Sequence, residues 1–220
     1  MKCAIFDLDG TLLDTSPGIF ESVCYAAQKL GYPQLSREQL QRFIGPPLKA
    51  SFQRCYGCND MAADRLTAAY REHYREGAML HAMPYKGVFS LCESLYNLGM
   101  QVAVATSKPQ LFADLILRHF GFNQYLTCVH GADLAGRLNK ADLIRACAED
   151  VNVFPEECVM IGDTEHDGRG ALEAGVPFIV AGYGFGHPEE MAKYPCIGVA
   201  NAPLEILHII ERKKEDNYNE

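Results

Sequence analysis

The stretch Cys3-Ala4-Ile5-Phe6-Asp7-Leu8-Asp9-Gly10-Thr11 decides the fold of this chain. Its first four residues form a compact apolar run followed at once by polar residues and glycine, which predicts a short buried strand. Because side chains alternate along a strand, Asp7 and Asp9 project to the same side of its carboxyl end, where open α/β sheets bind ligands. Two carboxylates followed by a glycine are typical of a site for Mg²⁺ and a phosphoryl group. The alternative is an ordinary acidic turn, since Asp and Gly are common turn residues.

Length and composition favour a globular protein. A chain of 220 residues, 48% hydrophobic and 22% charged, forms one large domain or two small ones around a real core. The net charge of −8 argues against binding to a nucleic-acid polymer. No apolar stretch approaches the ~20 residues of a membrane span. We therefore expect no nucleic-acid partner and no membrane, and the sequence leaves the oligomeric state open.

The cysteines indicate a reducing compartment. There are nine of them, an odd number, and they are scattered along the chain. The basic and long apolar regions of a signal peptide are missing, so we expect free thiols in the cytoplasm. Cys55 and Cys58 form a C-x-x-C pair, but no second pair or nearby histidine completes a zinc site, which favours a structural role.

The chain contains two segments with different predicted secondary structure. Residues 15–82 are predicted to be all-helical, with helices over 17–30, 36–43, 48–56 and 61–76. Afterwards strands and helices alternate, which predicts a parallel sheet with helices on both faces. The expected strands are 3–6, 101–105, 125–130, 158–161, 178–181 and 196–200, and the expected helices are 88–98, 109–120, 140–150, 168–174 and 203–212. We expect an α/β core of residues 1–14 and 83–213, an inserted helical domain of residues 15–82, and a frayed tail of residues 214–220.

Further polar residues follow the predicted strands. Thr106 and Ser107 place hydroxyl groups at a strand end, close to the amides of the next helix, where they could bind a phosphoryl group; the alternative is a helix cap. Lys140 opens a helix, where a cation opposes the helix dipole, which suggests a role in neutralising phosphoryl charge; the alternative is a solvated surface lysine, the usual state of an isolated Lys. In Gly162-Asp163-Thr164-Glu165-His166-Asp167, both aspartates can reach a cation at the sheet edge. Glu165 and His166 receive no role.

These motifs, taken in order, resemble the four motifs of the haloacid dehalogenase-like hydrolase superfamily. They are Asp7-Leu-Asp-Gly-Thr11, Thr106-Ser107, Lys140, and Gly162-Asp163-x-x-x-Asp167. The helical insert resembles the C1 cap of that superfamily, and the core its Rossmann-like domain. Two short segments, 43–48 and 163–167, resemble the branch of phosphoglycolate phosphatases and bacterial 5′-nucleotidases.

The resemblance implies a Mg²⁺-dependent phosphatase that acts on a small, anionic phosphorylated metabolite. Asp7 would be the nucleophile and would form an aspartyl-phosphate, while Asp9 would act as general acid and then general base. Mg²⁺ would be held by Asp7, the backbone carbonyl of Asp9, Asp163 and Asp167. Thr106, Ser107 and Lys140 would orient the phosphoryl oxygens and balance their charge.

Other functions are compatible with the same residues. A hexose-phosphate mutase would share every core residue, and a catalytically silent binding protein could use the same fold. Haloacid dehalogenases lack an acid/base aspartate at the position of Asp9, so Asp9 argues against that chemistry. The intact catalytic positions and the Gly-Pro-Pro loop favour hydrolysis.

The loop at Gly45-Pro46-Pro47 is the candidate substrate-facing segment of the insert. It is stiff except at the glycine. Arg42 and Lys49 flank it and are cations suited to a carboxylate or second phosphate on the substrate, although both could equally be solvated helix residues. We therefore expect Arg42, Gly45, Pro46 and Lys49 to contribute to substrate selection.

Overall fold

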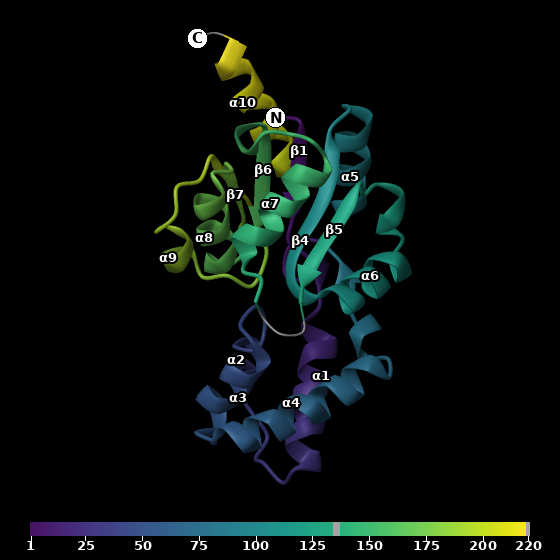
Figure 1. The fold of residues 1–220 in the computed structure, drawn as a ribbon, viewed down its shortest axis with the longest axis vertical. Coiled ribbons are helices and arrows are strands. Elements are labelled where there is room, and N and C mark those ends of the chain that lie inside the picture. Colours follow the sequence, from purple (N-terminus) through teal and green to yellow (C-terminus); the bar gives the residue numbers. More distant parts are fainter. Residues whose placement is uncertain (134–136, 219–220) are drawn as a thin grey trace. The chain divides into compact units, whose positions relative to one another are not determined.

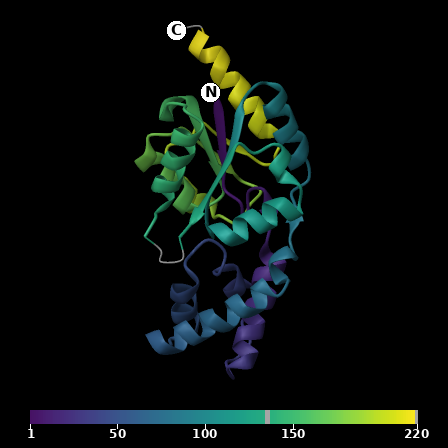
Figure 2. The same ribbon diagram turned by 45° about the vertical axis from the view of Figure 1, so that its right-hand side comes forward.

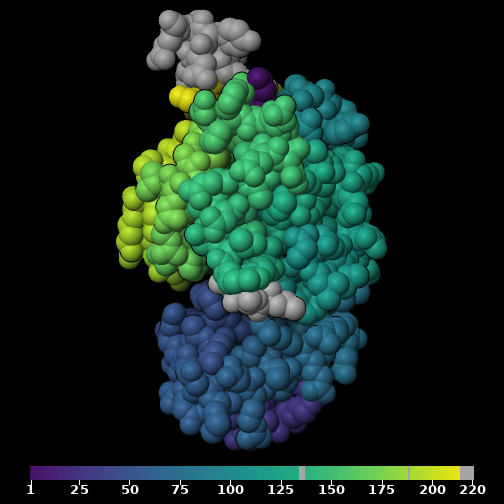
Figure 3. Space-filling view, in the orientation of Figure 1, coloured from purple at the N-terminus to yellow at the C-terminus, as the bar shows by residue number. Residues whose placement is uncertain are grey.

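The computed structural model describes residues 1–133 and 137–218, and it divides the chain into two compact units. The larger unit contains Met1–Leu13 and Pro84–Glu220, and the smaller unit contains Asp14–Met83. Figure 3 shows the smaller unit in purple to blue. At the two crossings, β2 (Leu13–Asp14) and β3 (Met83–Pro84) form a two-stranded sheet.

A six-stranded sheet with the order β5-β4-β1-β6-β7-β8 forms the centre of the larger unit, and its paired strands are parallel (Figure 1). This confirms the predicted α/β fold class. The strands are β1 (Cys3–Phe6), β4 (Gln101–Pro109), β5 (Cys128–Ala132), β6 (Cys158–Gly162), β7 (Phe178–Ala181) and β8 (Gly198–Ala200). Every residue of β1 is buried, because it lies between two neighbouring strands and beneath helices on both faces.

Helices cover both faces of this sheet. They are α5 (Val88–Asn97), α6 (Gln110–His119), α7 (Lys140–Asp150), α8 (Glu165–Ala174), α9 (Pro188–Met191) and α10 (Glu205–Tyr218). The helices α7 and α8 pack against each other and against the central strands, while α5 and α10 pack together (Figure 2). The core beneath α7 and α8 is apolar and includes Ile5, Ile144, Met160 and Phe178. It supports the carboxyl ends of β1 and β6, which carry the acidic motifs.

The smaller unit is helical. It contains α1 (Ser16–Lys29), α2 (Arg37–Gln41), α3 (Leu48–Tyr56) and α4 (Asp60–Arg75), with α4 packed on both α1 and α3. A capping box begins α2, since the Ser36 side chain accepts a hydrogen bond from the Gln39 amide and the Gln39 side chain accepts one from the Ser36 amide. Phe52 is fully buried and packs edge-on against Phe43 with ring centroids 4.9 Å apart.

Some element boundaries differ from those expected. The helix expected over residues 203–212 begins two residues later and continues further, because α10 spans Glu205–Tyr218. Lys, Arg and Glu are strong helix formers, so a charged segment extends a helix that is already anchored by Ile206 and Ile210. Residues 219–220 lie outside the described residues. The strand β4 also continues beyond Ala105 to Pro109 and therefore includes Thr106, Ser107 and Lys108.

No helix among the described residues combines the length and the apolar character that a membrane span requires.

Candidate active site

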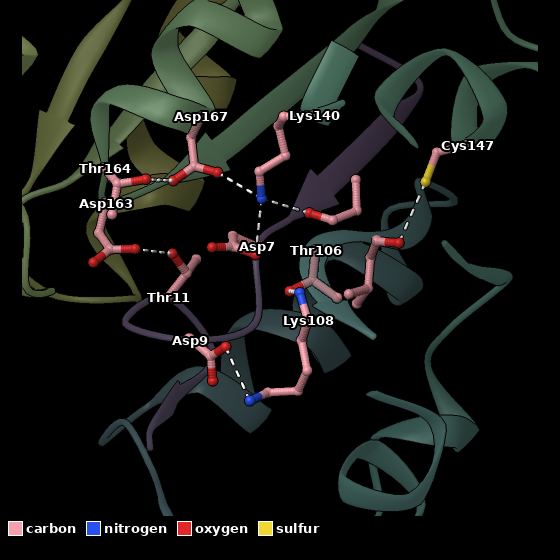
Figure 4. Close-up of polar contacts among 12 residues, drawn as sticks. Asp7, Asp9, Thr11, Thr106, Lys108, Lys140, Cys147, Asp163, Thr164 and Asp167 are labelled. Atoms are coloured by element: carbon pink, nitrogen blue, oxygen red, sulfur yellow. Dashed lines mark hydrogen bonds and ion pairs between the residues drawn. The ribbon is translucent and has the colours of Figure 1, made fainter. Parts of the chain in front are cut away.

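Asp7 lies directly after β1, and its side chain is almost completely buried at the carboxyl end of the sheet (Figure 4). Its Oδ1 atom lies 2.9 Å from Lys140 Nζ. Burial raises the pKa of Asp7 to about 6, and the repulsion of Asp167 and Asp9 adds to the increase while Lys140 opposes it. A carboxylate in this position is held ionised at neutral pH chiefly by the adjacent ammonium group.

Lys140 reaches the site from the first turn of α7. Asn139 caps that helix through its contact with the Asp142 amide, which fixes where the helix begins. The Lys140 ammonium lies 2.7 Å from Asp167 Oδ1 and donates to the Ala105 carbonyl at 2.9 Å. Burial alone would disfavour the charge, but Asp167 and Asp7 outweigh it and raise the pKa of Lys140. The lysine is thus a permanent positive charge beside Asp7.

Asp163 and Asp167 flank Asp7 from the turn between β6 and α8. Asp163 accepts a hydrogen bond from the Thr11 hydroxyl at 3.2 Å and another from the Phe185 amide at 2.8 Å. Asp167 uses Oδ2 to accept from the amide and hydroxyl of Thr164 at the start of α8. Burial, with repulsion from Asp167 and Asp7, raises the pKa of Asp163 well above its ordinary value.

The three carboxylates fit a divalent cation. Oxygen atoms of Asp7, Asp163 and Asp167 all lie within 4.8 Å of one another, and all three residues are buried. Apart from the Lys140 ion pairs, Asp7 Oδ1 and Asp167 Oδ1 accept no hydrogen bond from a described residue. Three buried negative charges face one ammonium group, so a hard cation with a preference for oxygen ligands would relieve their repulsion.

Asp9 lies at the same end of the sheet and forms an ion pair with Lys108, whose Nζ is 3.1 Å from Asp9 Oδ2. The side chain of Lys108 is only 6% exposed and that of Asp9 only 15%. The sequence did not identify Lys108, because the residue lies between the expected strand, which ends at Ala105, and the expected helix, which begins at Pro109. Its place in the sequence, directly after Thr106-Ser107, is the signal that could have identified it.

Thr106 is buried on β4 and lies beside Asp7 in Figure 4. Its hydroxyl accepts a hydrogen bond from the Lys108 amide at 3.2 Å, and this bond stabilises the backbone conformation at the end of the strand. Ser107 follows on the same strand and is exposed. The sheet therefore places Thr106 beside Asp7, and the exposed Ser107 follows it at the end of β4.

The glycine-rich loop Gly182-Tyr183-Gly184-Phe185-Gly186 packs closely on Asp163, a role that the sequence did not reveal. A Cβ atom at Gly184 would come within 2.3 Å of Asp163 Cβ and 2.4 Å of the Gly10 carbonyl oxygen. The Tyr183 hydroxyl donates to the Thr11 carbonyl at 2.9 Å. The loop thus supports the acidic turn through its backbone, and only glycine at position 184 permits the close approach.

The four expected substrate residues lie in the smaller unit, with Arg42, Gly45 and Pro46 between α2 and α3 and Lys49 in the first turn of α3. Gly45 has a φ of +96°, which supports the turn before Pro46. Lys49 lies 2.9 Å from Asp64 and 3.4 Å from Asp60, so its charge is balanced by α4. Arg42 is exposed and forms no ion pair with a described residue. Of the two cations, Arg42 therefore retains the less compensated charge.

Comparison with known proteins gives a consistent family assignment. The profile of the haloacid dehalogenase-like hydrolase family matches residues 4–181. A 5′-nucleotidase from Pseudomonas aeruginosa is 40% identical over 188 residues, covering 85% of both chains. A phosphoglycolate phosphatase from Thiobacillus denitrificans is 30% identical over 84% of this chain and 85% of its own.

Other relatives carry different names. A protein named tyrosine-protein kinase PtkA from Mycobacterium bovis is 33% identical over 91% of this chain and 69% of its own length. Among solved structures, a predicted phosphatase from Clostridium acetobutylicum superposes with a TM-score of 0.88 at 36% identity, covering 96% of this chain and 98% of the other. The family profile, the ordered motifs and the buried carboxylate cluster agree, and the chain belongs to the haloacid dehalogenase-like hydrolase family.

Proposed function

We propose that the protein is a Mg²⁺-dependent phosphatase that hydrolyses a small phosphomonoester through an aspartyl-phosphate on Asp7. The observation that carries the proposal is the buried Asp7 carboxylate, 2.9 Å from Lys140 Nζ and clustered with Asp163 and Asp167. Membership of the hydrolase family and similarity to a 5′-nucleotidase and a phosphoglycolate phosphatase support the reaction class.

In the first step, an oxygen of Asp7 forms a bond to phosphorus while the ester bond to the leaving alcohol breaks. Asp9 gives its proton to the departing oxygen. In the second step, Asp9 accepts a proton from water, whose oxygen attacks the phosphorus and releases inorganic phosphate. The acyl-phosphate bond breaks, and Asp7 returns to its carboxylate form.

Neighbouring groups make this attack electrostatically possible. Lys140 balances the charge of Asp7 and of the phosphoryl oxygens, and Thr106 and Ser107 donate hydrogen bonds to those oxygens. When bound by Asp7, Asp163, Asp167 and the backbone carbonyl of Asp9, Mg²⁺ supplies positive charge that offsets the repulsion between the carboxylate and the phosphate. Lys108 positions Asp9, because its ammonium holds one oxygen of that carboxylate at 3.1 Å.

The substrate is proposed to be a 5′-nucleotide or a small phosphorylated acid such as phosphoglycolate. Arg42, Gly45, Pro46 and Lys49 are proposed to contribute to its selection. The free state of the nine cysteines supports a reducing, cytoplasmic location.

A phosphate-release assay on a panel of phosphomonoesters tests the proposal. We expect turnover with Mg²⁺, loss of turnover with a chelator, and recovery when Mg²⁺ is restored. Asp7→Asn should reduce turnover by at least ~10³-fold, because an amide is a poor nucleophile. Turnover that is insensitive to both the chelator and Asp7→Asn would refute the proposal.

A further inference from the structure

A second cluster of metal-binding side chains lies in the larger unit, outside the proposed phosphatase site. Cys128 and His130 are on β5, and Cys147 is on α7. One ligand atom of each, the two Sγ atoms and a ring nitrogen, lies within 4.8 Å of the other two. We propose that this Cys128–His130–Cys147 cluster, which we call the thiol site, binds a thiophilic divalent cation of the Zn²⁺ class.

Secondary structure brings these groups together in a regular way. Cys128 and His130 are two residues apart on a strand, so their side chains project from the same face. Cys147 and Asp150 are three residues apart on α7 and therefore share one side of that helix. The helix α7 packs on β5, so Cys147 and Asp150 of the helix lie opposite Cys128 and His130 of the strand.

The donor set selects the kind of metal. Two thiolates and one imidazole are ligands that Zn²⁺ takes in tetrahedral sites, and a hard ion such as Mg²⁺ prefers oxygen ligands. Two thiolates neutralise a divalent charge, so the bound cluster would carry no net charge in this half-buried position. Binding replaces the two thiol protons, which are released to solvent. The Cys147 thiol donates to the Val104 carbonyl, with 3.4 Å between the sulfur and the oxygen.

Asp150 completes the arrangement. Its Oδ2 atom lies 2.8 Å from His130 Nε2, so Nδ1 is the ring nitrogen that the proposal assigns to the metal. A carboxylate on the second nitrogen is the usual device for orienting a metal-binding histidine. The side chains of His130 and Asp150 are 28% and 56% exposed, so an ion has a path from solvent. Neither an ordinary buried thiol nor a disulfide would need this histidine and aspartate pair.

The two thiols are also electrostatically different. A hydrogen bond with Cys147 lowers the pKa of Cys128, whereas that hydrogen bond and burial raise the pKa of Cys147.

The thiol site is separate from the carboxylate cluster. Cys147 lies seven residues after Lys140 on α7, which corresponds to about 10 Å along the helix axis. Figure 4 shows its sulfur apart from Asp7, Asp163 and Asp167. Cys55 and Cys58, the C-x-x-C pair of the sequence, join neither of the two metal-binding groups found among the described residues. The inference therefore does not depend on the proposed phosphatase activity.

Cobalt titration of the chelator-treated, reduced full chain tests the inference. Co²⁺ bound by thiolates gives an intense near-ultraviolet charge-transfer band that oxygen ligands do not give, so binding to the carboxylate cluster is not mistaken for it. We expect this band to saturate at one equivalent and to disappear when Zn²⁺ displaces Co²⁺. Cys128→Ser and His130→Ala should abolish it, and Asp150→Asn should weaken Zn²⁺ binding by ~10-fold or more.

The double variant Cys55→Ser/Cys58→Ser is the matched control and should retain the band. Thermal unfolding of each metal-free variant checks that it folds, and the half-exposed positions 130 and 150 provide variants that leave the core intact. Absence of the band in the wild type would overturn the inference. A band that survives both Cys128→Ser and His130→Ala would also overturn it, because other thiols would then hold the ion.

Discussion

At the scale of single residues, two neighbouring aspartates have different partners. Asp7 is paired with Lys140, whereas Asp9 is paired with Lys108. Their proposed tasks differ in the same way, since one attacks phosphorus and the other transfers protons. The two partner lysines make different contacts. Lys140 also contacts Asp167 and the Ala105 carbonyl, whereas Lys108 forms its ion pair with Asp9.

Lys108→Met should impair the proton transfer performed by Asp9. We expect kcat/KM to fall by ~10²-fold for alkyl phosphates, whose leaving groups need a proton, because general acid catalysis contributes ~10²–10⁴-fold. For 4-nitrophenyl phosphate, whose leaving group is stable as an anion, the decrease should be much smaller. Steady-state kinetics on both substrates measures the difference. Lys108→Arg is the control and should recover part of the activity, whereas equal losses on both substrates would contradict the positioning role.

At the scale of elements, the Gly182–Gly186 loop holds the acidic turn after β6. Gly184→Ala places a methyl group against Asp163 and the Gly10 carbonyl, so Asp163 must move. We expect the Mg²⁺ concentration for half-maximal activity to rise by ~10-fold, comparable with the loss of a group that supports a ligand. Gly182→Ala is the matched control. A Cβ atom at position 182 would lie 3.1 Å from its nearest neighbour, a methyl group of Val199, and would not approach Asp163. Similar Mg²⁺ requirements for the two variants would show that the loop does not position Asp163.

The loop between α2 and α3 provides a second prediction at this scale. Arg42→Ala should raise KM for phosphoglycolate by ~10-fold while leaving KM for 4-nitrophenyl phosphate nearly unchanged, because only the former carries a carboxylate. Lys49→Ala should have a smaller effect, since Asp60 and Asp64 already balance that charge. KM values for both substrates measure this split. An equal change for both substrates, or none, would remove the loop from substrate selection.

Several elements of the site were predictable because each depends on local sequence. Asp7 and Asp163 each come directly after an apolar run that forms a strand. Lys140 is the first residue of a helix, and the residue before it, Asn139, is a typical helix cap. Lys108 was missed because an extended strand end and a helix start look alike when Pro109 follows. The thiol site could not be predicted, since its strand and helix residues are brought together only by tertiary packing.

At the scale of the whole molecule, the buried carboxylates make stability depend on pH and on metal. The pKa of Asp163 is raised in the folded protein, and that of Asp7 is raised to about 6. Folding therefore favours their protonated forms, and their contribution to stability is lost as pH rises through the folded pKa.

We expect the Tm of the chelator-treated protein to decrease between about pH 4 and pH 6, the ordinary and the folded pKa of Asp7, and to decrease less in Asp163→Asn, which lacks one titrating carboxyl group. Added Mg²⁺ should raise Tm more at the higher pH, because the cation and protons compete for the same oxygens. Calorimetry on both proteins measures these shifts. An equal pH dependence in the wild type and in Asp163→Asn would contradict the assigned electrostatics.

The covalent step on Asp7 is the central claim, and trapping of the acyl-phosphate tests it most directly. Acyl phosphates are reduced by borohydride to alcohols, so an Asp7 phosphoenzyme quenched during turnover would yield homoserine at position 7. Mass spectrometry of the digested protein identifies the position. We predict homoserine at Asp7 only when both substrate and Mg²⁺ are present, and none in Asp7→Asn. Turnover without modification at Asp7, or modification at another carboxylate such as Asp9, would contradict the account.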